Sequence, residues 1–177
     1  MFLYNEVQKR ESNQERVRVG LIGAGKFGSM FLSQVPFSVG LEVISIVDIS
    51  VENAKKNCRD VGWTKEQIES VLFFDNLKKM VSQTKIDVLV EATGDPLEGT
   101  KHALIAIEEG LDIVMVNVEA DVLSGPYLAK EADKAGVVYS LAYGDQPALT
   151  TELVEWARAS GFHVVAAGKG TKYLPEY

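Results

Sequence analysis

Three glycines with the spacing Gly23-x-Gly25-x-x-Gly28 directly follow an apolar segment, residues 17–22. In a phosphate-binding turn the first glycine permits the tight bend and the second lets the main chain approach a diphosphate. The third lets the next helix pack closely on the strand. The diphosphate would lie at that helix N-terminus, where free N–H groups and the helix dipole favour an anion. The spacing therefore predicts a dinucleotide site with contacts from Gly23, Ala24, Gly25, Lys26, Phe27 and Gly28.

An acidic residue lies where the adenosine ribose of a dinucleotide would need one. The apolar segment 41–47 ends at Asp48, about 20 residues after the last glycine, which is the spacing of a ribose-binding carboxylate. A carboxylate there favours NAD because it repels a 2′-phosphate, but Lys55 and Lys56 follow closely, so NAD and NADP both stay open. The simpler alternative is an aspartate that only caps the next helix. The predicted contacts at this strand end are Asp48, Ile49 and Ser50.

Apolar segments of strand length alternate with helical segments along the chain, at residues 17–22, 41–47, 71–74, 86–91, 112–118 and 137–141. This alternation is typical of a doubly wound parallel sheet with helices on both faces, the Rossmann class of α/β fold. Capping residues predict helix starts at Thr64, Asp95 and Ser124. Glycines predict helix ends at Gly110 and Gly136.

Composition excludes several classes of function. The net charge is −7 and no dense stripe of basic residues is present, which argues against a nucleic-acid partner. No segment has the ~20 continuous apolar residues of a membrane span, and no signal peptide is recognisable. The one cysteine, Cys58, has no intrachain partner and no activating base nearby, so we expect a cytoplasmic protein without a nucleophilic thiol. His102 and His163 lack partners at metal-ligand spacing, so no metal site is predicted.

The chain divides into three parts on this interpretation. Residues 1–16 would form a helical arm, residues 17–145 the NAD(P)-binding Rossmann domain, and residues 146–177 a helix followed by a strand at 162–167. The last part would lead into a second domain that this chain does not contain. Hydride-transfer enzymes usually close the nicotinamide site with a further domain of ~100 residues or more. We therefore expect either a fragment or a missing half supplied by another polypeptide.

Several segments resemble the cofactor domain of homoserine dehydrogenase-like oxidoreductases: GLIGAG at 20–25, VEATG at 90–94 and VMVNVEAD at 114–121. Residues 143–147 and 167–173 are similar to the subgroup called deoxyxylulose-phosphate reductoisomerase-like, or SAF-domain, oxidoreductases. The resemblance covers nearly all of residues 15–177. It implies an NAD(P)-dependent oxidoreductase whose full-length relatives are much longer than this chain.

The resemblance also implies roles for residues after the fourth and fifth strands. Ala92, Thr93 and Gly94 would lie along the cofactor near the nicotinamide ribose, at the carboxyl edge where ligands bind in doubly wound sheets. Asn117 and Glu119 would meet the nicotinamide ring. Homoserine dehydrogenases tend to carry Asn-Lys where this chain has Glu119 and Ala120, which argues against homoserine as the substrate. Glu119 would orient the carboxamide or transfer a proton if burial raised its pKa; equally, it would cap a helix that begins near Ser124.

Lys169 lies between two glycines after the predicted strand at 162–167. It is a candidate to hold a substrate phosphate or carboxylate, or to polarise a carbonyl, with a solvated lysine in a turn as the alternative. The sequence thus predicts the cofactor half of an enzyme that transfers hydride between NAD(P) and a small oxygenated substrate, phosphorylated or not, in a homo-oligomer. A regulatory module that binds NAD(P) without turnover and an S-adenosylmethionine-dependent methyltransferase are the alternatives.

Overall fold

The computed structural model describes residues 2–144 and 146–168. The chain divides into two units, Met1–Ser140 and Leu141–Tyr177, which places the division earlier than the limit at 145 expected from the sequence. The first unit contains α1 (Leu3–Ser12), β1 (Val17–Ile22), α2 (Lys26–Gln34), a short 3-10 helix (Val35–Phe37), β2 (Leu41–Val47), α3 (Val51–Asp60), α4 (Lys65–Glu69), β3 (Leu72–Phe74), α5 (Leu77–Gln83), β4 (Val88–Glu91), α6 (Pro96–Glu108), β5 (Asp112–Met115) and α7 (Val118–Ala135). Strand β6 (Tyr139–Leu141) crosses the division, and α8 (Gln146–Ala159) belongs to the second unit.

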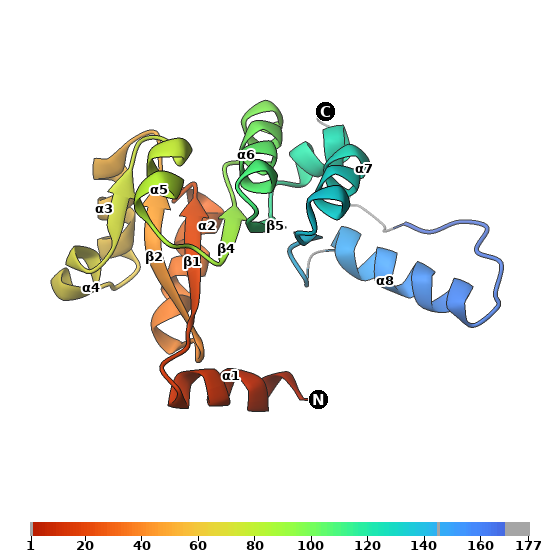
Figure 1. Cartoon of the computed structure of the whole chain (residues 1–177), viewed down its shortest axis with the longest axis horizontal. Helices are drawn as coiled ribbons and strands as arrows, with labels where there is room; N and C mark the ends of the chain where they lie inside the picture. The colour runs from red at the N-terminus through yellow and green to blue at the C-terminus, as the bar shows by residue number, and fades with distance from the viewer. Residues whose placement is uncertain (1, 145, 169–177) are drawn as a thin grey trace, which may run out of the picture. The chain divides into compact units, whose positions relative to one another are not determined.

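The strands form one sheet in the order β3-β2-β1-β4-β5-β6 (Figure 1). The pairs β2–β3, β1–β2, β1–β4 and β4–β5 are parallel. The order runs outward from β1 through β2 to β3, and then starts again on the other side of β1 with β4. This reversal between β1 and β4 confirms the predicted doubly wound Rossmann fold and creates the crevice in which such sheets bind ligands.

The carboxyl ends of the central strands are level. Ile22, the last residue of β1, pairs with Val47 of β2 and with Glu91 of β4, and Glu91 pairs with Met115 of β5. The residues that follow these strands therefore emerge along one edge of the sheet, although they lie far apart in the sequence.

Different helices pack on the two faces of the sheet. Leu21 of β1 packs with Leu32 of α2 and Cys58 of α3 in one cluster of buried apolar residues. On the opposite side of β1, a Cβ on Gly20 would come within 3.0 Å of the Met80 side chain of α5. Trp63 closes the first face, because its buried indole N–H donates to the carbonyl oxygen of Leu32 at 2.7 Å.

Most of the predicted helix caps are present. Thr64 forms a capping box with Gln67 at the start of α4, and the Asp95 carboxylate caps α6. Gly110 and Gly136 adopt left-handed backbone conformations, with φ of +71° and +72°, after α6 and α7. Local sequence therefore determines these helix ends.

Helix α7 differs from the sequence prediction. It begins at Val118, with Asn117 as its N-cap, and not near Ser124. Pro126 consequently lies inside the helix. The Ser124 hydroxyl caps no helix start; it donates to the Ala120 carbonyl oxygen at 3.0 Å. The expected fifth strand is shorter than residues 112–118 for the same reason: the Asn117 cap ends the extended segment and starts the helix.

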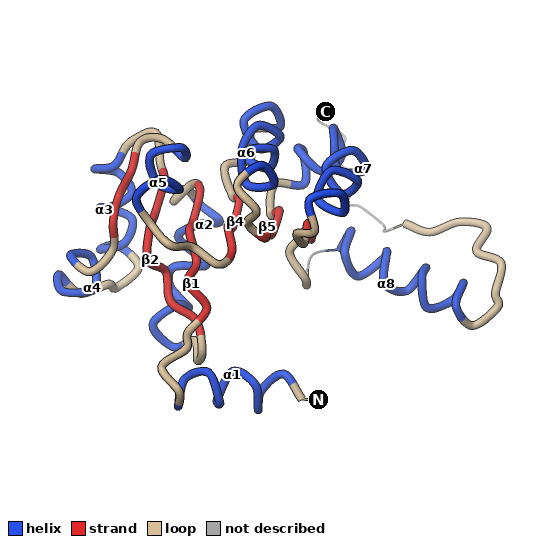
Figure 2. The backbone as a smooth tube through the Cα atoms, viewed as in Figure 1, coloured by secondary structure: helices blue, strands red, loops and turns tan. Residues whose placement is uncertain are grey.

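The second unit also differs from the prediction in part. Helix α8 is present, but residues 162–168 form a loop and not the expected strand (Figure 2). A strand needs a neighbour to share its main-chain hydrogen bonds, and none lies beside this segment among the described residues. Asp145, within the segment 143–147 that carries part of the resemblance, lies outside the described residues.

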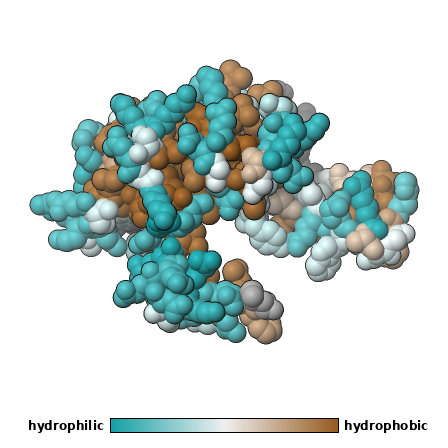
Figure 3. All heavy atoms as spheres, viewed as in Figure 1, coloured by the Kyte–Doolittle hydropathy of each residue, from teal (hydrophilic) through white to brown (hydrophobic). Residues whose placement is uncertain are grey.

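Helix α1 lies beside Gly40, at the edge of the sheet where β2 begins. The main-chain N–H of Gly40 donates to the Glu11 carboxylate at 3.0 Å, and Arg16 forms an ion pair with Glu11. Polar side chains cover most of the face of α1 seen in Figure 3, whereas Phe2 and Leu3 at its start are exposed apolar residues. Within the described parts of the chain, no helix is long and apolar enough to cross a membrane.

Candidate functional site

The glycine turn between β1 and α2 has a shape that larger residues would disturb. Gly23 has a φ of +89°, which favours glycine, and its N–H donates to the Val47 carbonyl oxygen at 2.8 Å. A Cβ on Gly28 would lie 2.0 Å from the carbonyl oxygen of Gly23, so α2 packs on the turn only with glycine there. By contrast, a Cβ on Gly25 would meet nothing within 4 Å. Open space therefore lies over Gly25, at the N-cap of α2.

The start of α2 offers main-chain donors to an anion. No side chain caps this helix, and its first residues, Lys26 and Phe27, are exposed. The first N–H groups of a helix have no partner within the helix. These donors lie beside the open space at Gly25, which suits a diphosphate.

Asp48 connects the glycine turn with the turn after β2. Its Oδ2 accepts a hydrogen bond from the Ala24 N–H at 2.9 Å, and its Oδ1 accepts one from the Ser50 N–H at 2.9 Å. The carboxylate is half-buried, and the next side chain, Ile49, is fully exposed. Each carboxylate oxygen can accept a further hydrogen bond, so Asp48 can hold a ribose hydroxyl while it orders both turns.

The turn after β4 lies directly beside the glycine turn. A Cβ on Gly23 would come within 3.0 Å of the Ala92 carbonyl oxygen and of the Thr93 nitrogen. Gly94 follows with a φ of +78°, and a Cβ there would meet no atom within 4 Å. The structure thus brings together the predicted contacts after β1, β2 and β4 on one edge of the sheet.

Asn117 extends this edge to β5. Its Nδ2 donates to the Asp95 carbonyl oxygen at 2.8 Å and lies 3.4 Å from Thr93 Oγ1, while its Oδ1 accepts the Ala120 N–H at 3.1 Å. The buried amide therefore joins the turn after β4 to the start of α7.

A buried carboxylate below this edge was not found from the sequence. Glu91 has no exposed surface, and its Oε1 accepts hydrogen bonds from Thr93 Oγ1 at 2.6 Å and from His102 Nδ1 at 3.1 Å. The spacing of His102 had only excluded it as a metal ligand and did not predict this contact. The sequence held one signal for this buried carboxylate. Glu91 ends an otherwise apolar strand, and an acidic residue in that place is unusual because burying a carboxylate is costly.

A second polar pair joins α7 and β6. The Tyr139 hydroxyl donates to Asp121 Oδ1 at 2.9 Å. Burial, followed by the hydrogen bond to Asp121 and by the charges of Asp121 and Glu91, raises the pKa of Tyr139. Tyr139 is therefore a neutral donor over the whole physiological range.

Of the two predicted catalytic residues, the described part of the chain contains Glu119, which is not part of this cluster. Glu119 lies in the first turn of α7 with an exposed side chain, so it lies neither at a strand end nor at a cap of a helix near Ser124. Lys169 lies outside the described residues. Among the residues that the structure describes, no group of three or more His, Cys, Asp or Glu side chains could hold a metal ion.

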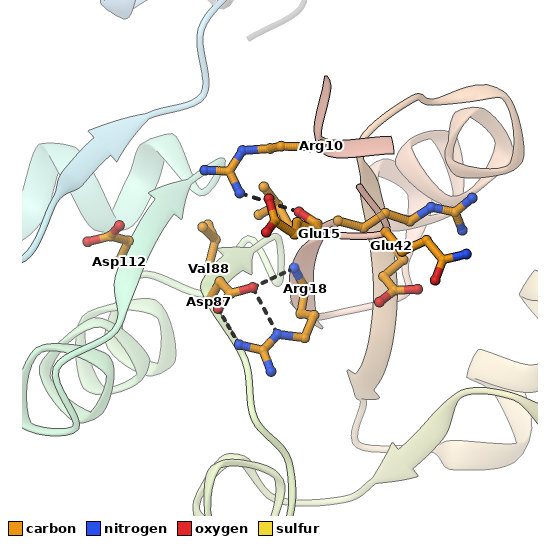
Figure 4. Close-up of a pocket in the computed structure, with 10 residues that line it drawn as sticks. Arg10, Glu15, Arg18, Glu42, Asp87, Val88 and Asp112 are labelled. Carbon is orange, nitrogen blue, oxygen red and sulfur yellow. Dashed lines mark hydrogen bonds and ion pairs between the residues drawn. The ribbon is translucent and has the colours of Figure 1, made fainter. Parts of the chain in front are cut away.

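A polar pocket lies at the opposite edge of the sheet, around the amino ends of β1, β2, β4 and β5 (Figure 4). Its Arg18 guanidinium forms two hydrogen bonds with the Asp87 carboxylate, and the Arg18 N–H donates a third to the same group at 2.8 Å. Because four acidic side chains line this pocket against three arginines, it does not compete with the carboxyl edge as an anion site.

A dinucleotide fits the residues at the carboxyl edge. The open space at Gly25, the uncapped start of α2 and the Asp48 carboxylate together define the class as a dinucleotide-binding Rossmann domain. Residues 17–143 match the family model GFO_IDH_MocA, described as an oxidoreductase family with an NAD-binding Rossmann fold. The chain belongs to this family, and its first unit is an NAD-binding domain. Residues 144–177 match a second model, the catalytic domain of oxidoreductase DRL.

Solved structures share the fold at low sequence identity. The WlbA dehydrogenase from Bordetella pertussis, in complex with NADH and UDP-GlcNAcA, is 23% identical with a TM-score of 0.62; the alignment covers 82% of this chain and 40% of that one. A homoserine dehydrogenase from Thiobacillus denitrificans is 18% identical with a TM-score of 0.60, over 71% of this chain and 29% of that one. This chain thus spans well under half of these proteins. A comparison with curated proteins found no match.

Proposed function

We propose that this chain is the cofactor-binding part of an oxidoreductase that transfers hydride between NAD(P) and a small oxygenated substrate. The open glycine turn that meets the uncapped start of α2 is the observation that carries the proposal. The nicotinamide supplies the hydride chemistry, and the protein supplies binding, orientation and electrostatic field.

Each part of the carboxyl edge has a role in this proposal. The N–H groups at the start of α2 hold the diphosphate, and Asp48 holds the adenosine ribose. Ile49, fully exposed beside Asp48, offers an apolar surface to the adenine. Thr93, Gly94 and Asn117 line the path of the nicotinamide half.

The finer assignment is to an enzyme related to homoserine dehydrogenases, and within them to the deoxyxylulose-phosphate reductoisomerase-like subgroup. The match of residues 144–177 to the catalytic domain of oxidoreductase DRL supports a catalytic domain after the NAD-binding one. In this assignment Lys169 holds an anionic group of the substrate, and the exposed Glu119 faces the substrate from the start of α7. The whole enzyme acts as a homo-oligomer in the cytoplasm.

Titration of the protein with NADH and with NADPH, followed by fluorescence, tests the proposal. The matched variant is Gly25→Ala, because the added methyl group meets no protein atom and so leaves the fold intact while it occupies the space for the diphosphate. We expect wild type to bind at least one of the two nucleotides and Gly25→Ala to lose at least tenfold in affinity.

Two results would contradict the proposal. One is a wild-type protein that binds neither nucleotide; the other is a Gly25→Ala variant with unchanged affinity. Binding of S-adenosylmethionine in place of NAD(P) would indicate a methyltransferase. Binding of NAD(P) without oxidoreductase activity in the full-length gene product would indicate a regulatory module.

A further inference from the structure

The buried carboxylate of Glu91 has no role in the function proposed above. It ends β4 with no exposed surface, and its Oε2 atom receives no hydrogen bond from the described residues. Removing a carboxylate from water is costly, and an acceptor left unpaired in the interior calls for an explanation. A role toward the bound cofactor is the explanation that its position favours.

Glu91 lies on the nicotinamide side of the crevice. Asp48 follows β2 on one side of β1, whereas β4 lies on the other side. With the adenosine half at Asp48 and the diphosphate at the glycine turn, the nicotinamide half extends toward the carboxyl ends of β4 and β5. Glu91 pairs with Ile22, the residue directly before the glycine turn, and its carboxylate accepts a hydrogen bond from Thr93 Oγ1 in the turn after β4, so its charge lies beside this path.

His102 of α6 is the ionisable group with a contact to the Glu91 carboxylate, its Nδ1 lying 3.1 Å from Oε1. The Glu91 charge also acts on Tyr139 of β6, whose hydroxyl donates to Asp121 of α7. Tyr139 is neutral, because burial and the nearby carboxylates raise its pKa. Among the described residues, no Lys or Arg side chain forms an ion pair with Glu91, so no fixed positive charge offsets its carboxylate.

We propose that Glu91 sets the preference of this domain for oxidised over reduced nicotinamide cofactor. The inference rests on the NAD(P) binding proposed above. The oxidised nicotinamide ring carries a positive charge that the reduced ring lacks. A buried carboxylate stabilises the cationic ring and has little effect on the neutral one, because the charge is poorly screened in the interior.

Calorimetric titration of oxidised and reduced cofactor into wild type and Glu91→Gln tests the proposal. The variant keeps the shape of the side chain and removes its charge. We expect the ratio of the two dissociation constants to shift toward the reduced form on the order of tenfold, because a poorly screened unit charge near the ring acts mainly on the cationic form. Glu108→Gln, an exposed position at the end of α6, is the matched control and leaves the ratio unchanged.

The ratio separates an electrostatic role from a structural one. If Glu91→Gln weakens both forms equally, or leaves the ratio unchanged, Glu91 only supports the fold and the inference is wrong. If the wild-type protein binds neither form, the proposed function itself fails. The two failures are therefore distinguishable in one experiment.

A second comparison covers a Glu91→Gln protein that does not fold. His102→Lys places a fixed positive charge beside the Glu91 carboxylate, whereas His102→Gln keeps a neutral donor there. The ratio of the two dissociation constants should shift toward the reduced cofactor in His102→Lys relative to His102→Gln. Equal ratios in these two variants would overturn the inference.

Discussion

The carboxylate of Asp48 accepts a hydrogen bond from the main-chain N–H of Ala24 at 2.9 Å, and thereby ties the end of β2 to the glycine turn after β1. The same carboxylate orders the turn at Ser50. One side chain thus holds in place the two turns between which the adenosine half of the cofactor is expected to bind.

Asp48→Asn should weaken both the fold and NADH binding. The amide has one acceptor oxygen for two main-chain donors, and its NH2 group faces an N–H group. We expect a loss of about 1–3 kcal/mol in the free energy of unfolding and roughly tenfold weaker NADH binding, with a smaller loss for NADPH. Urea denaturation and fluorescence titration measure these effects, and Asp60→Asn on the exposed end of α3 is the control. An unchanged NADH affinity would show that Asp48 does not contact the ribose.

Gly28→Ala should destabilise the protein where Gly25→Ala does not. The new Cβ at position 28 would lie 2.0 Å from the Gly23 carbonyl oxygen, so α2 must move away from the turn, whereas position 25 is open. We expect Gly28→Ala to lose about 1–3 kcal/mol in unfolding free energy and Gly25→Ala to stay within about 0.5 kcal/mol of wild type. Equal stability of the two variants in urea denaturation would contradict the packing described here.

The ion pair between Arg18 and Asp87 should make stability depend on pH in acid. The hydrogen bond from Arg18 holds the pKa of Asp87 below its usual value. Because the folded pKa is the lower one, this stabilisation is present above the unfolded pKa and is lost as pH falls through the folded pKa. Both side chains are partly exposed, so the contribution at pH 7 is under about 1 kcal/mol. Urea denaturation at pH 7, 5 and 3 should show a smaller acid-induced loss for Asp87→Asn than for wild type; parallel losses would exclude the effect.

Cys58 should resist thiol reagents in the native protein. It is fully buried in α3, and burial raises the pKa of its thiol to about 11. A neutral thiol is a poor nucleophile, so labelling with a disulfide reagent at pH 8 should follow unfolding and become fast in urea. Because the folded pKa is the higher one, the associated stability is full below the unfolded pKa of ~8.5 and declines as pH rises toward the folded value. Fast labelling of the native protein would contradict the burial of Cys58.

Sequence patterns predicted the features that depend on neighbouring residues. The bounds of β1 and β2, the left-handed glycines after α6 and α7, and the capping box at Thr64 all agree with the structure. Alternation of strands and helices was enough to predict the parallel sheet, because a crossover between parallel strands requires a connecting element on one face.

Two local signals for a helix start compete near the beginning of α7. Ser124 and Pro126 form a strong local pattern for a helix start, but Asn117 caps the helix earlier. The Asn117 amide is buried against the Asp95 carbonyl oxygen, a contact with the turn after β4 that no local pattern contains. As a result Glu119 lies on an exposed helical turn and not at a strand end.

By itself, the sequence determined the Rossmann architecture and the glycine turn that receives a dinucleotide, because hydrophobic periodicity, glycine spacing and capping act over a few residues. Only the tertiary structure decided which polar groups meet beneath that turn: Asp48 with Ala24, and Glu91 with His102. The physical reason is that level strand ends in a parallel sheet bring together residues separated by whole helices, and the hydrogen bonds of a buried carboxylate depend on that meeting.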